Sequence, residues 1–240
     1  MSTIARLSLP AFEVLWEDLR AGAAIPYPFD ITQHGTTLDE RARVRNDVHA
    51  DLERRGLARR GRPEPELEDA LRLLATPDTS ITVMGMLDVA REDLVRALVA
   101  ARGRYVVLAV QGTEGVQLDL IKEAGLAQAA VRVLPPRPPG PGRPVTVPAA
   151  ALQAQTNQSG IRQNVRTAGN DDVRALREML SGPITGTGHF TAHPHGTAVT
   201  WIDTPRGRYA SMGTDWLTVA PADHTGLVRR ISQALAPQAR

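Results

Sequence analysis

A run of prolines and glycines, PPRPPGPGRP, occupies residues 135–144 and divides the chain. Proline has no backbone N–H, and its ring clashes with the preceding helical turn, so neither a helix nor a central strand passes through such a run. The run therefore predicts an extended, semi-rigid linker between residues 1–134 and residues 145–240. A ligand for a proline-recognising domain is the alternative function of such a tract.

The first half predicts a mixture of strands and helices, because alternating apolar residues and apolar stripes at helical spacing follow one another. Thr37 and Glu40 have the spacing of a capping box, which predicts the start of a helix. The predicted elements of this half are a strand at 4–9, a helix after Pro10, helices from Thr37 toward Gly56 and from Pro65 to just before Pro77, a strand at 80–87, a helix at 91–101, strands at 105–110 and 116–121 around a turn at 112–115, and a short strand at 130–134.

The second half opens on the same pattern as the first. VTVPAAAL at 145–152 parallels LSLPAFEV at 7–14, since each gives an alternating strand, a proline and the start of a helix. Proline is favoured in the first turn of a helix. The remaining elements predicted in this half are a helix at 172–180, strands at about 184–191, 197–203, 207–212 and 215–220, and a final helix capped by Asp223.

The tetrapeptide RGRY occurs twice, at Arg102–Tyr105 and at Arg206–Tyr209. In the first copy Gly103 is expected to end the helix at 91–101. In the second copy the glycine closes the sequence TPRG, which favours a β-turn. Both copies are expected to open a strand that meets an antiparallel partner.

These parallels predict an α+β fold with quasi-two-fold duplicated halves. The halves, about 1–134 and 145–240, form a single domain joined by the linker at 135–144 and share a central, mostly antiparallel sheet flanked by two helical bundles. Two separate domains are the alternative, although each half alone would have a thin core.

The composition excludes several classes of protein. There is no cysteine, which removes disulfides, thiol chemistry and cysteine-based zinc sites. The N-terminus does not resemble a signal peptide, and no stretch approaches about 18 consecutive apolar residues. A cytoplasmic protein without a membrane partner is expected, as a monomer or a weak homodimer.

Motifs for catalysis are missing from the sequence. The glycine-rich stretch at 182–190 lacks the Lys-Ser or Lys-Thr pair of a phosphate-binding loop. His189, His193 and His195 share one parity, which would place three metal ligands on one face of a strand, but HPHGT predicts a hairpin tip. We therefore expect no enzyme, no cofactor and no metal, and a metal-dependent enzyme using these histidines stays as an alternative.

A second alternative is a nucleic-acid-associated regulator that uses the arginine-rich helix at 41–62. Acidic residues are interleaved with the arginines, several at i, i+4 spacing, and this mixing is typical of a solvated helix face with weak ion pairs. We therefore expect no nucleic-acid partner. The acidic residues are Asp39, Glu40, Asp47, Asp51 and Glu53.

The chain resembles the EspG family of actinobacterial type VII (ESX) secretion chaperones over almost its whole length. The resemblance rests on an ordered set of segments rather than on one motif. The segments are LSLPAFEVLWEDL, IPYPFDITQHGTTLDERARV, PELEDALRLLATPDTSITVMGML, VTWIDTPRGRYASM and WLTVAPADHTGLVRRISQAL. The stretch at about 149–182 is short for this family, so a reduced second helical bundle is expected.

The resemblance implies a cytosolic chaperone that keeps a helical secretion substrate soluble before export. The substrate would be a PE–PPE or a WXG100-like heterodimer, bound at its apolar tip through the sheet and neighbouring loops. We expect the binding surface around the strand at 81–87 and the helix at 91–101. The candidate contact residues are Met84, Met86, Leu87, Val89, Arg91 and Leu94.

Each of these contact candidates has a plainer interpretation as well. Methionine suits adaptable interfaces, but it also fills irregular gaps in a core. Trp201 and Trp216, on neighbouring predicted strands, are expected to be core residues rather than contacts.

Overall fold

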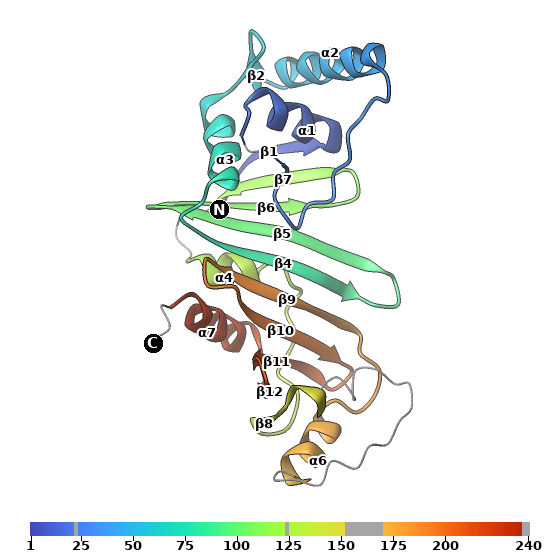
Figure 1. The fold of residues 1–240 in the computed structure, drawn as a ribbon, viewed down its shortest axis with the longest axis vertical. Helices are drawn as coiled ribbons and strands as arrows, with labels where there is room; N and C mark the ends of the chain where they lie inside the picture. Colours follow the sequence, from blue (N-terminus) through green and yellow to red (C-terminus); the bar gives the residue numbers. More distant parts are fainter. Residues whose placement is uncertain (22–23, 123–124, 152–169, 237–240) are drawn as a thin grey trace. The chain divides into compact units, whose positions relative to one another are not determined.

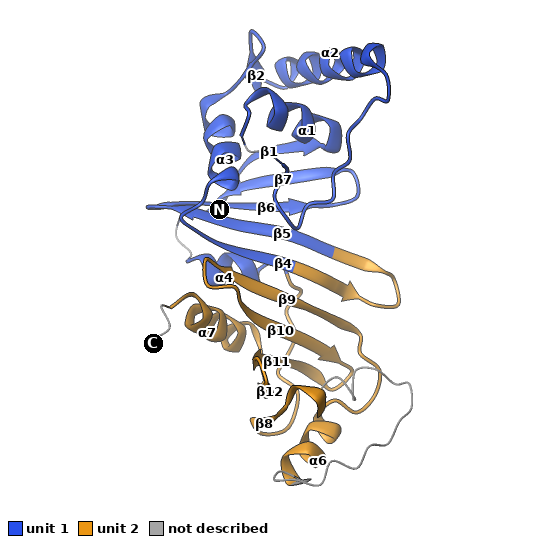
Figure 2. Cartoon of the chain, viewed as in Figure 1, with its two compact units in different colours: residues 1–83, 95–133 blue, residues 84–94, 134–240 orange. Residues whose placement is uncertain are grey.

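A computed structural model of the chain describes residues 1–21, 24–122, 125–151 and 170–236. The chain forms two compact units (Figure 2). Unit 1 comprises residues 1–83 and 95–133, and unit 2 comprises residues 84–94 and 134–240. Strands β4 (Thr79–Asp88) and β5 (Asp93–Arg102) form a hairpin that contributes its base to unit 1 and its tip to unit 2.

Unit 1 contains an antiparallel sheet with the order β1-β7-β6-β5-β4 (Figure 1). Its further strands are β1 (Ser2–Ser8), β6 (Tyr105–Gln111) and β7 (Gly115–Leu120). Pairs β1–β7, β7–β6 and β6–β5 are all antiparallel. The predicted strands at 4–9, 80–87, 105–110 and 116–121 are confirmed.

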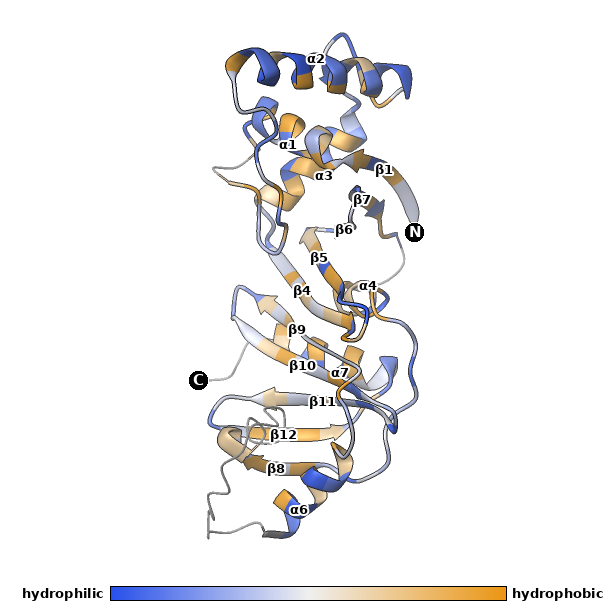
Figure 3. Cartoon of the chain, turned by 90° about the vertical axis from the view of Figure 1, so that its right-hand side faces the viewer, coloured by the Kyte–Doolittle hydropathy of each residue, from blue (hydrophilic) through white to orange (hydrophobic). Residues whose placement is uncertain are grey.

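The first three helices of unit 1 lie over one face of this sheet, whereas α4 (Leu126–Val131) contacts β6 on the other face. Helices α1 (Leu9–Asp18) and α3 (Pro65–Ala75) pack on it, and α2 (Leu38–Arg54) packs on α1. The Thr37–Glu40 capping box that starts α2 is present as predicted. The core of the unit is mostly aliphatic, with Leu15, Leu71, Leu74, Val107 and Leu118 among its residues, and it contains one aromatic cluster of Phe12, Trp16 and Phe29. Helix α2 is mostly hydrophilic, as Figure 3 shows. Only Val48 and Leu52 along it are buried, and the rest of the helix faces solvent or is partly exposed.

Two predicted elements of unit 1 are wrong. Residues 93–101 form most of strand β5 instead of a helix, and residues 130–134 form the end of helix α4 and the turn after it instead of a strand. Residues 97–101 of β5 are all buried, so both faces of the strand are apolar. A continuous apolar run satisfies helical and strand spacing alike, and periodicity cannot separate the two. A small hairpin of β2 (Ala58–Arg59) and β3 (Arg62–Pro63) links α2 to α3.

Unit 2 continues from the distal part of β4 with the strand order β9-β10-β11-β12-β8. The strands are β8 (Val145–Pro148), β9 (Gly186–His193), β10 (Thr197–Thr204), β11 (Gly207–Gly213) and β12 (Trp216–Pro221). Pairs from β9 to β8 are antiparallel. Helix α7 (His224–Leu235) packs on β9 and β10, and α6 (Asn170–Met179) packs on β8.

The architecture confirms the α+β class with a large antiparallel sheet, and it confirms the predicted strands of the second half. Asp223 caps α7 as predicted, since its Oδ1 accepts from the Gly226 N–H at 2.8 Å. The helix predicted after Pro148 is described only over 149–151, and the weakly patterned stretch that follows lies outside the described residues. The duplication into two pseudo-repeats stays a prediction.

The two RGRY copies have different environments. In the first, Gly103 does not end a helix; its φ of +56° forms the tight turn between β5 and β6, where Arg102 pairs with Tyr105. In the second, Gly207 closes the turn between β10 and β11, as predicted, because it pairs with Thr204. The first copy is exposed, whereas Arg208 in the second is completely buried.

Arg208 forms a bidentate ion pair with the buried Asp203 across the β10–β11 hairpin. Its Nε and Nη2 donate to the two carboxylate oxygens at 2.7 and 2.9 Å. A third group joins, since Arg137 Nε lies 3.3 Å from Asp203 Oδ2. Arg137 belongs to the proline-rich segment, so the pair also holds that segment.

The proline-rich segment is extended, as predicted, and it is bound to unit 2 along its length. The Arg208 N–H donates to the Pro138 carbonyl at 2.9 Å, and the Gly140 N–H donates to the Arg208 carbonyl at 3.0 Å. Tyr209 Oη donates to the Pro141 carbonyl at 3.1 Å. The Tyr209 ring lies so close to Gly140 that there is no space for a side chain at that position. The prolines have no N–H to donate, so the Gly140 N–H and the proline carbonyls make these bonds, and Pro139 pairs with Arg208 in a single parallel bridge.

In unit 1 the buried carboxylate of Glu13 holds the loop before α2. It accepts from the His34 N–H at 3.0 Å, lies 2.8 Å from His34 Nδ1, and lies 2.8 Å from Arg41 Nη2. Burial by itself raises the pKa of Glu13, but the hydrogen bonds from His34 and then Arg41 outweigh it, and the net pKa is lowered. Glu13 is therefore ionised in the folded protein under neutral conditions.

Because the pKa of Glu13 is lowered on folding, its contribution to stability is full above its unfolded pKa and is lost as the pH falls through the folded pKa. We predict that Glu13→Gln lowers the free energy of unfolding by about 1–3 kcal/mol at pH 7. The gap to the wild type should narrow as the pH falls below about 4.3, the ordinary value for Glu. Urea unfolding of both proteins across pH 3–7 measures this difference in the free energy of unfolding. Asp47→Asn, an exposed substitution on α2, should follow the wild-type profile; a constant gap for Glu13→Gln would contradict the assignment.

The two RGRY copies provide a matched pair of substitutions at the same motif position. Arg208→Met leaves Asp203 buried without its main partner and should cost about 3–5 kcal/mol. Arg104→Met, in the exposed copy, should change stability by less than about 0.5 kcal/mol. Thermal unfolding of both variants tests this. The double variant Asp203→Leu with Arg208→Met should recover part of the loss, and equal effects of the two arginines would contradict the account.

Candidate partner-binding surfaces

The tip of the β4–β5 hairpin, residues 84–94, is the first candidate surface. Asp88 ends β4, and its Oδ1 accepts from the N–H groups of Ala90 and Arg91 at 2.9 and 3.2 Å. A short polar side chain that bonds the backbone ahead of it fixes a turn. Glu92 completes the turn with a φ of +53°. The hairpin tip is therefore formed by local hydrogen bonds.

The six predicted contact residues all lie in this hairpin tip. Met84, Met86 and Leu87 are half-buried on β4, and Arg91 is exposed with its Nε 3.7 Å from Asp88 Oδ2. Val89 and Leu94 are 39% and 43% exposed, which is high for aliphatic residues. The predicted residues thus form one segment with an apolar, solvent-facing end.

Two glycines support the hairpin tip by admitting a tryptophan. A Cβ on Gly85 would lie 2.8 Å from Trp201 Cη2, and a Cβ on Gly188 would lie 2.2 Å from the same atom. The indole of Trp201 therefore packs against strands β4 and β9 where both lack side chains. Phe190 completes the cluster, with its ring centroid 5.1 Å from that of Trp201. Trp201 is fully buried, as predicted.

Trp216 does not lie in the core, contrary to prediction. It is 56% exposed at the start of β12, where it pairs with Pro148 of the edge strand β8. The apolar run WLTVA suggested a buried strand, but only its later residues, Val219 and Ala220, are buried. An exposed tryptophan beside a short edge strand is a contact candidate that the sequence prediction missed.

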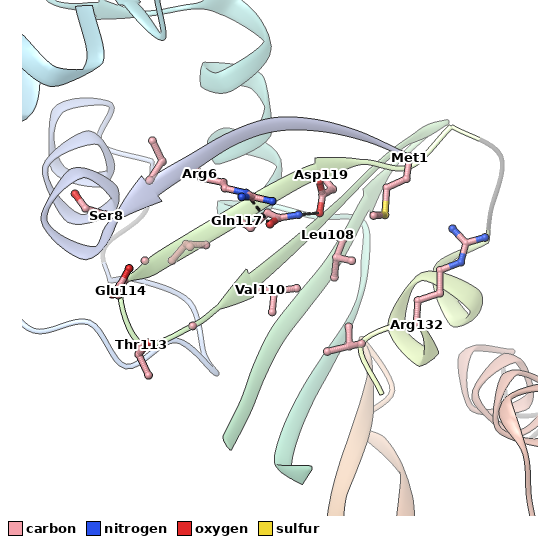
Figure 4. Close-up of a pocket in the computed structure, with 15 residues that line it drawn as sticks. Met1, Arg6, Ser8, Leu108, Val110, Thr113, Glu114, Gln117, Asp119 and Arg132 are labelled. Carbon is pink, nitrogen blue, oxygen red and sulfur yellow. Dashed lines mark hydrogen bonds between the residues drawn. The ribbon is translucent and has the colours of Figure 1, made fainter. Parts of the chain in front are cut away.

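The second candidate surface is a hollow in unit 1 of about 810 Å³ (Figure 4). Leu108 and Val110 alternate with Val107 and Ala109, which belong to the helix-covered core, so they face the opposite side of the sheet. The hollow thus lies on the face away from α1 and α3. Val133, after α4, closes one side of it.

A row of polar side chains crosses this hollow, as Figure 4 shows. Arg6 Nε donates to Gln117 Oε1 at 3.1 Å, and Gln117 Nε2 donates to Asp119 Oδ2 at 2.8 Å. Thr3 Oγ1 donates to Asp119 Oδ1 at 2.7 Å. Asp119 is 2% exposed, so these bonds satisfy a buried carboxylate.

The sequence VQLDLI contains an alternation of polar and apolar residues that indicates this second, polar face of the sheet. Gln117 and Asp119 alternate with Val116, Leu118 and Leu120 on β7. The apolar set faces the helices, and the polar set marks a face that no helix covers completely. A concave face with apolar and polar groups together is the kind of surface that binds a partner.

The three histidines singled out by the sequence do not form a cluster. His193 and His195 are exposed at the β9–β10 hairpin tip, as HPHGT predicted, whereas His189 is half-buried on β9 and burial lowers its pKa. Within the ranges that the structure describes, no three His, Asp or Glu side chains are grouped so as to hold a metal ion. No described helix is long and apolar enough to span a membrane.

The arginines of α2 are mostly engaged in ion pairs. Arg41 and Arg45 lie 2.5 and 3.1 Å from Glu17 Oε2, and Arg45 also pairs with Asp18. Arg54 and Arg55 pair with Asp51 of the same helix. The helix predicted over 41–62 ends at Arg54, and Arg43, Arg59, Arg60 and Arg62 of that stretch form no ion pair with another described residue. The nucleic-acid alternative is therefore reduced to these four arginines, because phosphate binding needs cations that are not already paired.

Comparison with known proteins identifies one family and one fold. The family model of the EspG family matches residues 8–233. No curated protein matches the chain. The solved structures that match include the Mycobacterium tuberculosis type VII secretion system chaperone EspG5 in complex with a PE25–PPE41 dimer. The TM-score is 0.65 at 14% identity, over 96% of this chain and 95% of that chain.

Proposed function

The chain belongs to the EspG family, and from that premise we propose that it is a chaperone of type VII secretion. It binds a helical secretion substrate, a PE–PPE or a WXG100-like heterodimer, and keeps it soluble in the cytoplasm until export. The observation that carries the proposal is the family match over residues 8–233, nearly the whole chain. The similar fold of EspG5, solved with a PE25–PPE41 dimer, supports it.

The hairpin tip at 84–94 is the part of the substrate-binding surface that we propose first. Val89 and Leu94 expose aliphatic surface there, and the half-buried Met84 and Met86 can adjust to a partner. The charged Arg91 beside them provides a polar rim. An apolar centre with a polar rim is the usual composition of a reversible interface.

Binding alone accounts for this function, and we propose no chemical step. A chaperone of this kind covers an apolar patch that would otherwise aggregate, and it must later release it. Two exposed aliphatic residues and a few half-buried ones form a modest patch, which favours release over permanent association.

Co-expression tests the proposed function directly. We expect a PE–PPE or WXG100-like pair encoded by the same genome to be recovered in soluble form only with this protein, as a complex of defined mass. Pairs expressed alone should aggregate, since their apolar tips would stay exposed. Size-exclusion chromatography with light scattering gives the mass. Failure with every such pair of that genome would sink the proposal.

The hairpin tip has its own test, a double substitution with a matched control. Val89→Ser with Leu94→Ser removes two exposed apolar contacts and should weaken the complex about tenfold to one hundredfold, about 1.4–2.8 kcal/mol. Leu38→Ser removes an aliphatic residue that is 90% exposed on α2, and it should leave affinity unchanged. Calorimetric titration measures both. Equal affinities for the double variant and the wild type would place the substrate elsewhere.

A further inference from the structure

A groove in unit 1 has the properties of a second docking site, separate from the hairpin tip. We propose that this groove, between α3 and the β5–β6 turn, binds an amphipathic helix of another protein that carries basic side chains on one flank and acidic side chains on the other. The groove has a volume of about 790 Å³. The proposal does not depend on the substrate that the hairpin tip binds.

The floor of the groove is apolar. Val107 and Leu120 are directly opposite each other on β6 and β7, and Ile4 of β1 lies beside them. Ala70 and Leu73 of α3 form one wall. A concave apolar surface of this volume is in the range that binds ligands or the anchor side chains of a partner.

The rims of the groove carry opposite charges. Glu66 and Asp69 stand on the α3 side, one turn before Ala70 and Leu73, and Arg104 stands on the side of the turn. Glu66, Asp69 and Arg104 form no ion pair with another described residue, although both signs line the same groove. The groove's other two arginines are engaged, Arg72 by Glu68 and Arg102 by Thr76. An occupant with basic groups toward α3 and acidic groups toward the turn complements both rims.

The walls of the groove are held in place by hydrogen bonds. Arg102 Nη2 donates to the carbonyl and to the hydroxyl of Thr76, which caps the end of α3. The Asp78 N–H donates to the Ala101 carbonyl at 2.9 Å, and the Gly103 N–H donates to Asp78 Oδ2 at 3.3 Å. The turn is therefore tied to α3, and a preformed groove lowers the entropic cost of binding.

The backbone around the floor favours a helix over an extended peptide. Strand β6 is paired on both sides, by β5 and β7, and β7 is paired by β6 and β1. Among the described strands of the floor, only β1, the outer strand of the sheet, has an unpaired edge, so β6 and β7 have no backbone groups left for an extended chain. A helix satisfies its own backbone groups and needs only side-chain contacts, as in helix-in-groove recognition.

Tyr105 is the large hydrophobic side chain at the groove that is most exposed to solvent. It opens β6, whose next four residues are buried, yet its own ring is 62% exposed. Tyrosine and arginine are the residue types that most often dominate binding energy at protein interfaces. The exposed RGRY copy thus places both types at the rim of an apolar groove.

Two synthetic helical peptides serve as probes, each with leucines on one face. One carries lysines on one flank and glutamates on the other, and the second carries lysines on both flanks. The full-length protein should bind the mixed peptide at least about tenfold more tightly, measured by fluorescence anisotropy. Arg104→Glu replaces the unpaired cation at the turn by an anion. It should therefore reverse the preference, so that the peptide with lysines on both flanks binds more tightly than the mixed peptide. Tyr105→Ser should lower the affinity for both peptides about tenfold.

Controls separate this proposal from its competitors. Arg43→Glu, an exposed change on α2, should not alter either affinity, and Tyr105→Ser should leave binding of the secretion substrate unchanged. Absence of peptide binding to the wild type, or a preference that Arg104→Glu does not reverse, would overturn the proposal. So would self-association in sedimentation that Tyr105→Ser abolishes, because the occupant would then be a second copy.

Discussion

Main-chain pairing between antiparallel strands is the constraint on which both units depend. Only 4% of the residues are aromatic, so most core side chains are valine, leucine and alanine, and many of them lie on paired strands. Buried N–H and C=O groups must find partners, and inner strands such as β6 and β10 find them on both sides. The outer strands are limited in other ways. Strand β8 has four residues, and the Arg6 carbonyl of β1 accepts from Arg55.

The proline-rich segment also pairs its backbone groups, but without forming a ladder of strand hydrogen bonds. Its prolines have no N–H to donate, so its Pro138 carbonyl accepts from Arg208 and its Gly140 N–H donates back. Arg208 is anchored in turn by Asp203. A tetrapeptide that is an exposed turn in one hairpin is therefore a buried anchor in another. Local sequence decides that RGRY stands at a turn, and tertiary packing decides whether its second arginine meets solvent or a carboxylate.

The sequence predicted most elements because prolines, capping residues and strand alternation are local signals. Thr37, Pro65 and Asp223 mark helix starts that the structure contains. The failures share a physical cause: burial is not local. Strand β5 is apolar on both faces, so its leucines also fit a helix, and Trp216 is apolar yet 56% exposed. The predicted contact residues lay together because they are adjacent in the chain. In the polar row, Gln117 and Asp119 leave a local pattern on β7, but the bond from Arg6 to Gln117 joins residues 111 positions apart and has no local signal.

A protein that works by binding must keep apolar surface exposed without aggregating itself. The hairpin tip does so by alternating Val89 and Leu94 with charged neighbours, on a turn that Asp88 holds in shape. The groove beside α3 does so by sinking its apolar residues between charged rims, so that only Tyr105 protrudes. In both places the exposed apolar area is small and interrupted by charge, which disfavours self-association of flat patches. Affinity then has to come from shape and from charge placement, and those are the properties by which such a surface can distinguish one helical partner from another.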